Sequence, residues 1–401
     1  MNTLNLSLLS MCLLASTAAA GKEWKNECTG YYQMELPEGL EVALYVVKNI
    51  THPPEEPLSR SGILMQRTRE PVITFGDKVY EKSDDRVQSQ FSEHYYLNYK
   101  IGISSESVAL INLSEYKRKV ASDFEFDAVS GRQLEQRRLR VLHDPLTPEN
   151  EFNRIYGFLI KDYNNAFSAY EPTGYTLSIS SGHRLYQFWA KRDDYLDEKS
   201  QTAENQWRKK EPEVKSLLSR FRPRELYEVP NDQGFCIPYG FIANDSGQEP
   251  HNMAVTYRLK SHPDVSIFFQ TLTADPGPGD NRPNTEMSEK DYVTDFLNNI
   301  YGHSFRDIKI YGKGFTYPEI DGRKAVSAFA KFTRFDKTVD YGYVAYVKGK
   351  TPTEPTLMFY LIRKGSLASG SAPVDKKDLE KMAEHIVASI KHRQVDIHRP
   401  Q

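Results

Sequence analysis

The first twenty residues constrain the fold most, because they decide the compartment in which the rest of the chain folds. Residues 4–20 are apolar or small and end in three alanines, the pattern that precedes cleavage by signal peptidase. We therefore expect residues 1–20 to be a signal peptide, cleaved between Ala20 and Gly21. A buried helix or a membrane anchor is the alternative, but the run is short for a membrane span and a polar stretch follows it. The usual basic residue before the apolar run is missing.

Two cysteines, Cys28 and Cys236, remain after removal of this segment, in a compartment where disulfides form. Their even number predicts one bridge between the beginnings of the two halves of the chain. Two buried thiols are the alternative, because a sequence does not show whether two Cα atoms approach to about 6 Å.

Length and charge limit the architecture and the partners. A chain of 401 residues exceeds what one hydrophobic core usually serves, so we expect two domains, residues 21–230 and 231–401, joined by a linker at residues 222–234. The 52 basic and 54 acidic side chains nearly cancel, so nucleic acid is not an expected partner. No second long apolar stretch follows the signal peptide, and stable membrane insertion is not expected either.

The order of strands and helices in the first half predicts an α+β domain, in which amphipathic helices pack on a mainly antiparallel sheet. Aromatic and β-branched runs predict strands, the first two of which flank a Pro-Glu-Gly turn and predict a hairpin. The half closes on a helix that begins near Pro212, ends before Pro223 and buries Val214 and Leu217. The predicted strands are 31–36, 41–47, 154–160, 174–179 and 184–190.

The second half repeats this order, which suggests a tandem duplication without a residue-level repeat. Between its strands, Ser288 and Asp291 form a predicted capping box and Gly302 ends the helix. The last helix presents one apolar face, made by Leu379, Met382, Ile386, Val387 and Ile390. The predicted strands are 255–259, 265–271, 325–333, 341–347 and 357–363.

The sequence contains no Gly-x-Ser-x-Gly nucleophile elbow and no His-Glu-x-x-His zinc motif. We therefore expect no catalytic, cofactor-binding or metal-binding residues and no cofactor. The stretches 312–314 and 244–247 are predicted to be turns rather than a phosphate cradle and a calcium loop. Two alternatives stay open: an exported hydrolase whose acids meet only on folding, and a ligand-binding module of the cell envelope.

Two short motifs carry a family resemblance. Residues 28–39, CTGYYQMELPEG, and residues 234–242, GFCIPYGFI, resemble the openings of the two domains of type VI secretion lipase immunity proteins. The resemblance covers most of the mature chain in order and in domain size. It implies a periplasmic, non-enzymatic inhibitor that binds its cognate lipase or phospholipase effector 1:1, contacts the cap region of that enzyme and blocks substrate entry.

The resemblance transfers no contact residue, so the interface is predicted from turn-rich segments. The first segment, residues 51–60, offers Pro53, Pro54, Glu55 and Glu56. The second, residues 273–286, offers Asp275, Pro276 and Asp280. Prolines lower the entropy that a loop loses when a partner fixes it, which favours binding. Surface turns without a partner are the alternative.

Overall fold

The computed structural model describes most of the mature chain. The predicted signal peptide, its Ala20–Gly21 cleavage site and the candidate interface residues Pro53, Pro54, Glu55, Glu56, Asp275, Pro276 and Asp280 lie outside the described residues. The described residues are 23–47, 50, 73–76, 78–80, 94–107, 111–171, 174–191, 202–273, 287–299, 305–351, 353–368 and 372–395.

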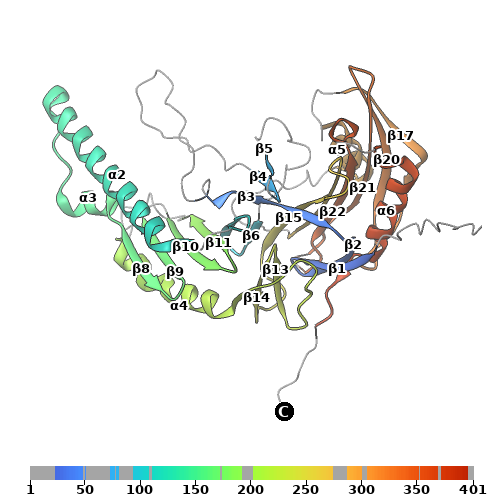
Figure 1. The fold of residues 1–401 in the computed structure, drawn as a ribbon. Helices are drawn as coiled ribbons and strands as arrows, with labels where there is room; N and C mark the ends of the chain where they lie inside the picture. Colours follow the sequence, from blue (N-terminus) through green and yellow to red (C-terminus); the bar gives the residue numbers. More distant parts are fainter. Residues whose placement is uncertain are drawn as a thin grey trace, which may run out of the picture.

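The fold is α+β, as the order of elements predicted, and one long antiparallel sheet runs through the molecule (Figure 1). The first-half strands are β1 (Trp24–Thr29), β2 (Tyr32–Pro37), β3 (Leu40–Tyr45), β4 (Ile73–Phe75), β5 (Lys78–Tyr80), β6 (His94–Tyr96), β7 (Tyr99–Ile103), β8 (Leu159–Tyr163), β9 (Ala166–Glu171), β10 (Gly174–Ser181), β11 (Arg184–Lys191) and β12 (Phe221–Pro223). The second-half strands are β13 (Gly234–Ile237), β14 (Gly240–Ala243), β15 (His251–Leu259), β16 (Val265–Leu272), β17 (Phe305–Thr316), β18 (Glu319–Ile320), β19 (Arg323–Lys324), β20 (Val326–Arg334), β21 (Val339–Val347), β22 (Thr356–Arg363) and β23 (Lys391–His392). The helices are α2 (Leu113–Leu142), α3 (Glu149–Tyr156), α4 (Ala203–Arg220), α5 (Glu289–Asn299) and α6 (Lys376–Ser389).

The two halves share one topology. In the sheet, the first half has the strand order β8-β9-β10-β11-β7-β6 and the second half has β17-β20-β21-β22-β16-β15. Along the chain, each half runs through two strands, a helical crossover, four strands of the sheet and a closing helix, with α5 in the place of α2 and α3. The topology is therefore that of a tandem duplication.

The halves meet where β6 pairs with β15, with His94 opposite Met253 and Tyr96 opposite His251. Strand β3 pairs with the other end of β15. Every residue of β15 is buried, and one hydrophobic cluster extends through both halves. Because the sheet and the core are continuous, the division at residues 230 and 231 remains a proposal about chain organisation.

Burial of two histidines at this junction predicts acid sensitivity. Desolvation lowers the pKa of His94 to about 3 and the pKa of His251 to about 4, below the ordinary value of about 6.5 in an unfolded chain. At a pH between the folded-state pKa and 6.5, each histidine binds a proton in the unfolded chain but not in the folded protein. The free energy of unfolding therefore falls as the pH falls. We expect a loss of about 2 kcal/mol per histidine at pH 5 relative to pH 8. Urea unfolding at both pH values checks this, and equal midpoints would contradict it.

Strand β2 and strand β3 lie where the sequence predicted them, but their predicted hairpin is wrong. Strand β2 pairs with β1 and β23, whereas β3 pairs with β15 and β4. Gly39, with φ of +79°, redirects the chain between them. The actual partners β15 and β23 come from the other half of the chain, which a local pattern does not reveal.

Two helix predictions also need correction. Residues 154–156, predicted to begin a strand, are the last turn of α3, because the aromatic side chains of this segment pack on α2. Helix α4 begins at Ala203, capped by Thr202, so Pro212 lies inside the helix rather than at its start. The capping box of α5 is confirmed in its backbone part, since the Ser288 hydroxyl accepts from the Asp291 amide at 3.2 Å.

Candidate protein-binding site

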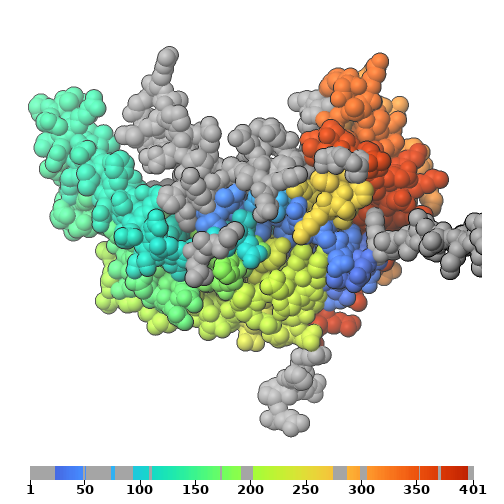
Figure 2. Space-filling view, viewed as in Figure 1, coloured from blue at the N-terminus to red at the C-terminus, as the bar shows by residue number. Residues whose placement is uncertain are grey.

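Two arms extend from the ends of the sheet (Figure 1). We call residues 113–156, which contain α2 and α3, the helical arm. We call residues 305–339, which contain β17 and β20, the strand arm. In the space-filling view both arms rise on the same side of the molecule, the helical arm in cyan-green and the strand arm in orange (Figure 2).

The base of the helical arm is anchored. The Asn112 side chain caps α2 by accepting from the Glu115 amide at 3.0 Å. In the next turns, Tyr116 packs edge-to-face on Phe167 of β9, and Val120 and Phe124 join the same hydrophobic cluster. This packing fixes the direction in which the distal part of α2 projects.

Helix α3 is bound to the distal part of α2 by close side-chain contacts. The Arg132 guanidinium lies 3.6 Å from the centre of the Phe152 ring and donates to the Thr147 carbonyl at 3.1 Å. The Tyr156 ring lies against Gly131, where an added Cβ would be 2.4 Å from a ring carbon. The arm is therefore a paired-helix element. None of the described helices is both long and apolar enough to span a membrane.

The helical arm exposes an unusual amount of apolar surface. Within the described residues, twelve large apolar side chains are exposed, and eight of them belong to this arm. Large apolar side chains that are exposed in this number on one element make it a candidate interaction surface. The eight residues are Phe126, Val129, Leu134, Leu139, Val141, Leu142, Leu146 and Ile155.

The other four exposed apolar side chains belong to the strand arm: Ile310, Tyr311, Tyr317 and Phe335. Here β17 bulges between Ile310 and Phe315, and the predicted turn at residues 312–314 lies in this bulge. Gly312 and Gly314 have φ of +72° and +77°, which favours glycine. Both ends of the molecule thus carry apolar surface.

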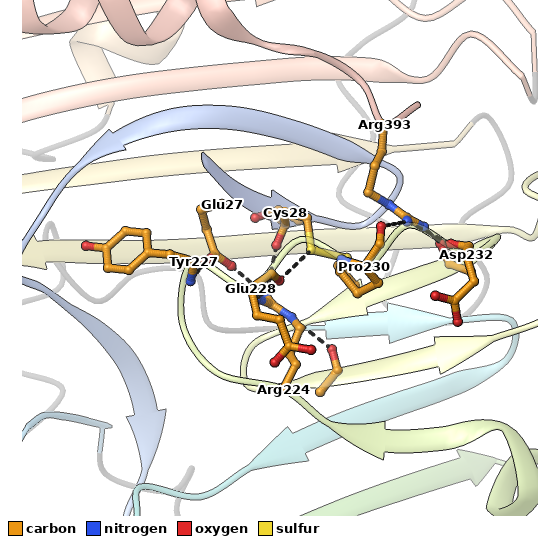
Figure 3. Close-up of a disulfide and its surroundings, with 12 residues drawn as sticks. Glu27, Cys28, Arg224, Tyr227, Glu228, Pro230, Asp232 and Arg393 are labelled. Atoms are coloured by element: carbon orange, nitrogen blue, oxygen red, sulfur yellow. Dashed lines mark hydrogen bonds and ion pairs between the residues drawn. A yellow bond between two sulfur atoms is a disulfide. The ribbon is translucent and has the colours of Figure 1, made fainter. Parts of the chain in front are cut away.

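A disulfide joins β1, the first strand of the first half, to β13, the first strand of the second half (Figure 3). It joins Cys28 and Cys236, whose Cα atoms are 5.9 Å apart, so the bridge expected from the cysteine count is present. Both cysteines are buried against Phe241 and Ala243. The bridge holds the opening strands of the two halves together.

The Asp245 carboxylate in the turn at residues 244–247 accepts hydrogen bonds from other groups of the protein. The Tyr31 hydroxyl donates to Asp245 at 2.8 Å and lies 2.7 Å from Glu249. Burial is the main cause that raises the pKa of Asp245, while the Tyr31 and Tyr96 hydroxyls oppose it. Within the described residues, no three His, Cys, Asp or Glu side chains gather as metal ligands. The carboxylates of this turn serve the packing of Tyr31.

A cavity of about 610 Å³ lies beside the start of α6. Its wall includes Trp24, whose indole lies 3.8 Å from the His385 ring, and the charged residues Asp375, Asp378 and Lys381. The Nε2 atom of His385 lies 2.8 Å from a Glu35 oxygen. This mixed lining differs from the deep apolar pocket expected of a ligand-binding module.

Sequence reasoning missed the helical arm. The mostly charged surface of α2 has no apolar stripe, and a stripe was the signal used to predict the other helices. A usable signal was the Asn112 cap with Glu115 three residues later, followed by thirty residues without proline. The loops that the sequence favoured as interface lie mostly outside the described residues, so they remain predictions.

The two halves are joined by a disulfide, and both arms expose apolar side chains. These features are those of a protein-binding protein. Residues 228–394 match the model of the Tle cognate immunity protein 4 C-terminal domain. This part of the chain belongs to that domain family, and the resemblance to type VI lipase immunity proteins is confirmed. No curated protein sequence matches the chain.

Solved structures share the fold over nearly the whole chain. The Pseudomonas aeruginosa type VI immunity protein TplEi, bound to an "L" peptide, is 16% identical with a TM-score of 0.50 and covers 93% of this chain and 99% of its own. Its apo structure gives the same identity and TM-score, covering 93% and 98%. The Tle4–Tli4 complex matches at 15% identity with a TM-score of 0.52, covering 93% and 98%.

Proposed function

We propose that this protein is a periplasmic immunity protein that inhibits a type VI-secreted lipase or phospholipase. It binds the enzyme between the helical arm and the strand arm, over the cap region, and blocks substrate entry. The observation that carries the proposal is the placement of exposed apolar surface on both arms of one frame, in a chain whose second half belongs to an immunity-protein domain family.

The similar proteins support a protein partner. One is an immunity protein in complex with Tle4, and another is an immunity protein with a bound peptide. The disulfide fits an oxidising compartment such as the periplasm. The inhibition needs no chemistry by this chain, because covering the entrance of an enzyme is enough to stop it. We therefore propose a non-enzymatic, 1:1 inhibitor.

Stoichiometric titration tests this function. A protein that neutralises a lethal lipase must leave little of it free, which requires a dissociation constant of about 1 nM, or about −12 kcal/mol. Lipase activity is expected to fall linearly and to approach zero at equimolar protein. Complete inhibition by a small molar fraction of this chain would instead mean that it modifies or cleaves the lipase.

Removing one apolar contact from each arm is expected to weaken binding. Phe126 and Phe335 are 61% and 69% exposed, so replacing either by serine leaves the fold intact. Each variant is expected to raise the dissociation constant about 10-fold or more, since large aromatic side chains dominate interface energetics. Gln136→Ser, at an exposed polar position of α2, is the control. Unchanged affinity in both phenylalanine variants would show that the lipase binds elsewhere.

A further inference from the structure

The two halves exchange strands at their base. Strand β12, which directly follows the closing helix of the first half, pairs with β14 of the second half. Strand β23, which directly follows the closing helix of the second half, pairs with β2 of the first half. Each half therefore completes a three-stranded sheet in the other, and the closing helices α4 and α6 are tied to the opposite half.

Arg224 binds several segments of this base at once, although the sequence predicted a linker here (Figure 3). Its Nη2 atom donates to the Glu27 carboxylate at 2.5 Å and to the Cys28 carbonyl at 2.9 Å. Its Nε atom donates to the Gly240 carbonyl at 3.2 Å. The other Glu27 oxygen accepts from the Tyr227 amide. The segment is thus fixed to the opening strands of both halves.

Arg393 binds the same segment from the C-terminal end of the chain (Figure 3). Its guanidinium donates to the carbonyls of Pro230, Asp232 and Gly234, at 2.5, 2.8 and 2.5 Å. Its backbone amide donates to the Tyr31 carbonyl at 2.8 Å. Within the described residues, three carbonyls and no carboxylate hold this buried guanidinium. The Nη1 and Nη2 atoms reach these carbonyls, while the buried Nε atom has no hydrogen-bond partner among the described residues.

We propose that Arg393 is a positioning residue, which locks the segment between the halves and so fixes the spacing of the two arms. The proposal rests on the proposed function, in which one partner contacts both arms. Arms that are already correctly spaced lose less conformational freedom on binding, so the lock increases affinity without touching the partner.

The spacing of the arms in the free protein is the direct test. Gln136→Cys on the helical arm and Lys309→Cys on the strand arm provide exposed sites for spin labels, because the two cysteines of the mature protein are bonded to each other. Pulsed electron paramagnetic resonance then gives the distribution of label distances. We expect one narrow distribution in the labelled parent protein and a distribution at least twice as wide with Arg393→Met.

Arg222→Met is the matched control, because Arg222 pairs with Asp232 on the surface of the same segment, where both side chains are about half exposed. It is expected to keep the narrow distribution. Should Arg393→Met fail to fold, Arg393→Lys keeps the charge but loses the planar set of donors, and it is also expected to broaden the distribution. A narrow distribution in the Arg393 variants, or a broad one in the parent or in Arg222→Met, overturns the proposal.

A binding measurement separates this inference from the proposed function. We expect Arg393→Met to dissociate from the lipase about 10-fold faster while the 1:1 stoichiometry stays the same. Because the distance measurement contains no lipase, failure of the parent protein to inhibit a lipase would refute the function and leave the lock standing. A broader distance distribution in Arg393→Met together with an unchanged dissociation rate would refute the role of Arg393 in binding.

Discussion

Replacing Arg224 by methionine is expected to destabilise the protein by about 3–5 kcal/mol, the cost of leaving a buried charge without its partner. Arg224 and Glu27 are each only 1% exposed, and the substitution strands the Glu27 carboxylate in the core. Several backbone carbonyls lose their donor as well. Urea unfolding of the purified variant at neutral pH measures the loss.

Two further variants make this prediction specific. Arg222→Met, two positions earlier, removes an exposed pair with Asp232 and the contact of its guanidinium with the Phe241 ring at 4.9 Å, and is expected to cost no more than about 1 kcal/mol. Adding Glu27→Gln to Arg224→Met removes the stranded charge and is expected to recover part of the stability. A loss for Arg224→Met as small as that for Arg222→Met would contradict the structural role of the buried pair.

Removing the disulfide is expected to have the other large effect on stability. The bridge closes 208 residues of chain, for which the loop-entropy model gives an upper limit of about 5 kcal/mol. We expect Cys28→Ala with Cys236→Ala to lower the free energy of unfolding by about 2–5 kcal/mol. Both sulfurs are buried beside Phe241, so alanine avoids placing new hydroxyl groups there.

The parent protein in a reducing agent is the internal comparison for this prediction. Its stability is expected to approach that of the double alanine variant, because both lack the covalent constraint on the unfolded chain. Peptide mapping without reduction is expected to find the cross-linked pair. Equal stability of the parent with and without the reducing agent, after complete reduction, would show that the bridge adds nothing to the folded frame.

Local pattern was sufficient for most of the long elements of the second half, although β17 was not predicted. The mostly buried strands β15, β16, β20, β21 and β22, the capped helix α5 and the apolar face of α6 all lie where the sequence predicted them. Each of these segments carries its own periodicity and its own stop signal. The two cysteines likewise indicated one bridge, and short motifs beside them indicated the family.

The exposed apolar side chains of the two arms were not predictable in this way. Sequence reasoning chose proline-rich loops, because turns with low flexibility suit an interface. Those loops lie mostly outside the described residues and remain a prediction, whereas the exposed large apolar side chains of the described residues lie on the helical arm and the strand arm. Whether Phe126 or Phe335 is exposed depends on what packs beside it, and that is decided by segments distant in the sequence.

The sequence by itself determined the fold class, the export signal as an expectation, the shared order of elements in the two halves, and two cysteines as a candidate bridge. Only the tertiary structure decided that β2 pairs with β23 and that the predicted linker at residues 222–234 is fixed by hydrogen bonds of the buried Arg224 and Arg393 side chains. The physical reason is that strand periodicity specifies which side chains face a core but not which strand lies alongside. Likewise, a buried arginine such as Arg224 or Arg393 is recognisable only once its partners have been brought to it from far along the chain.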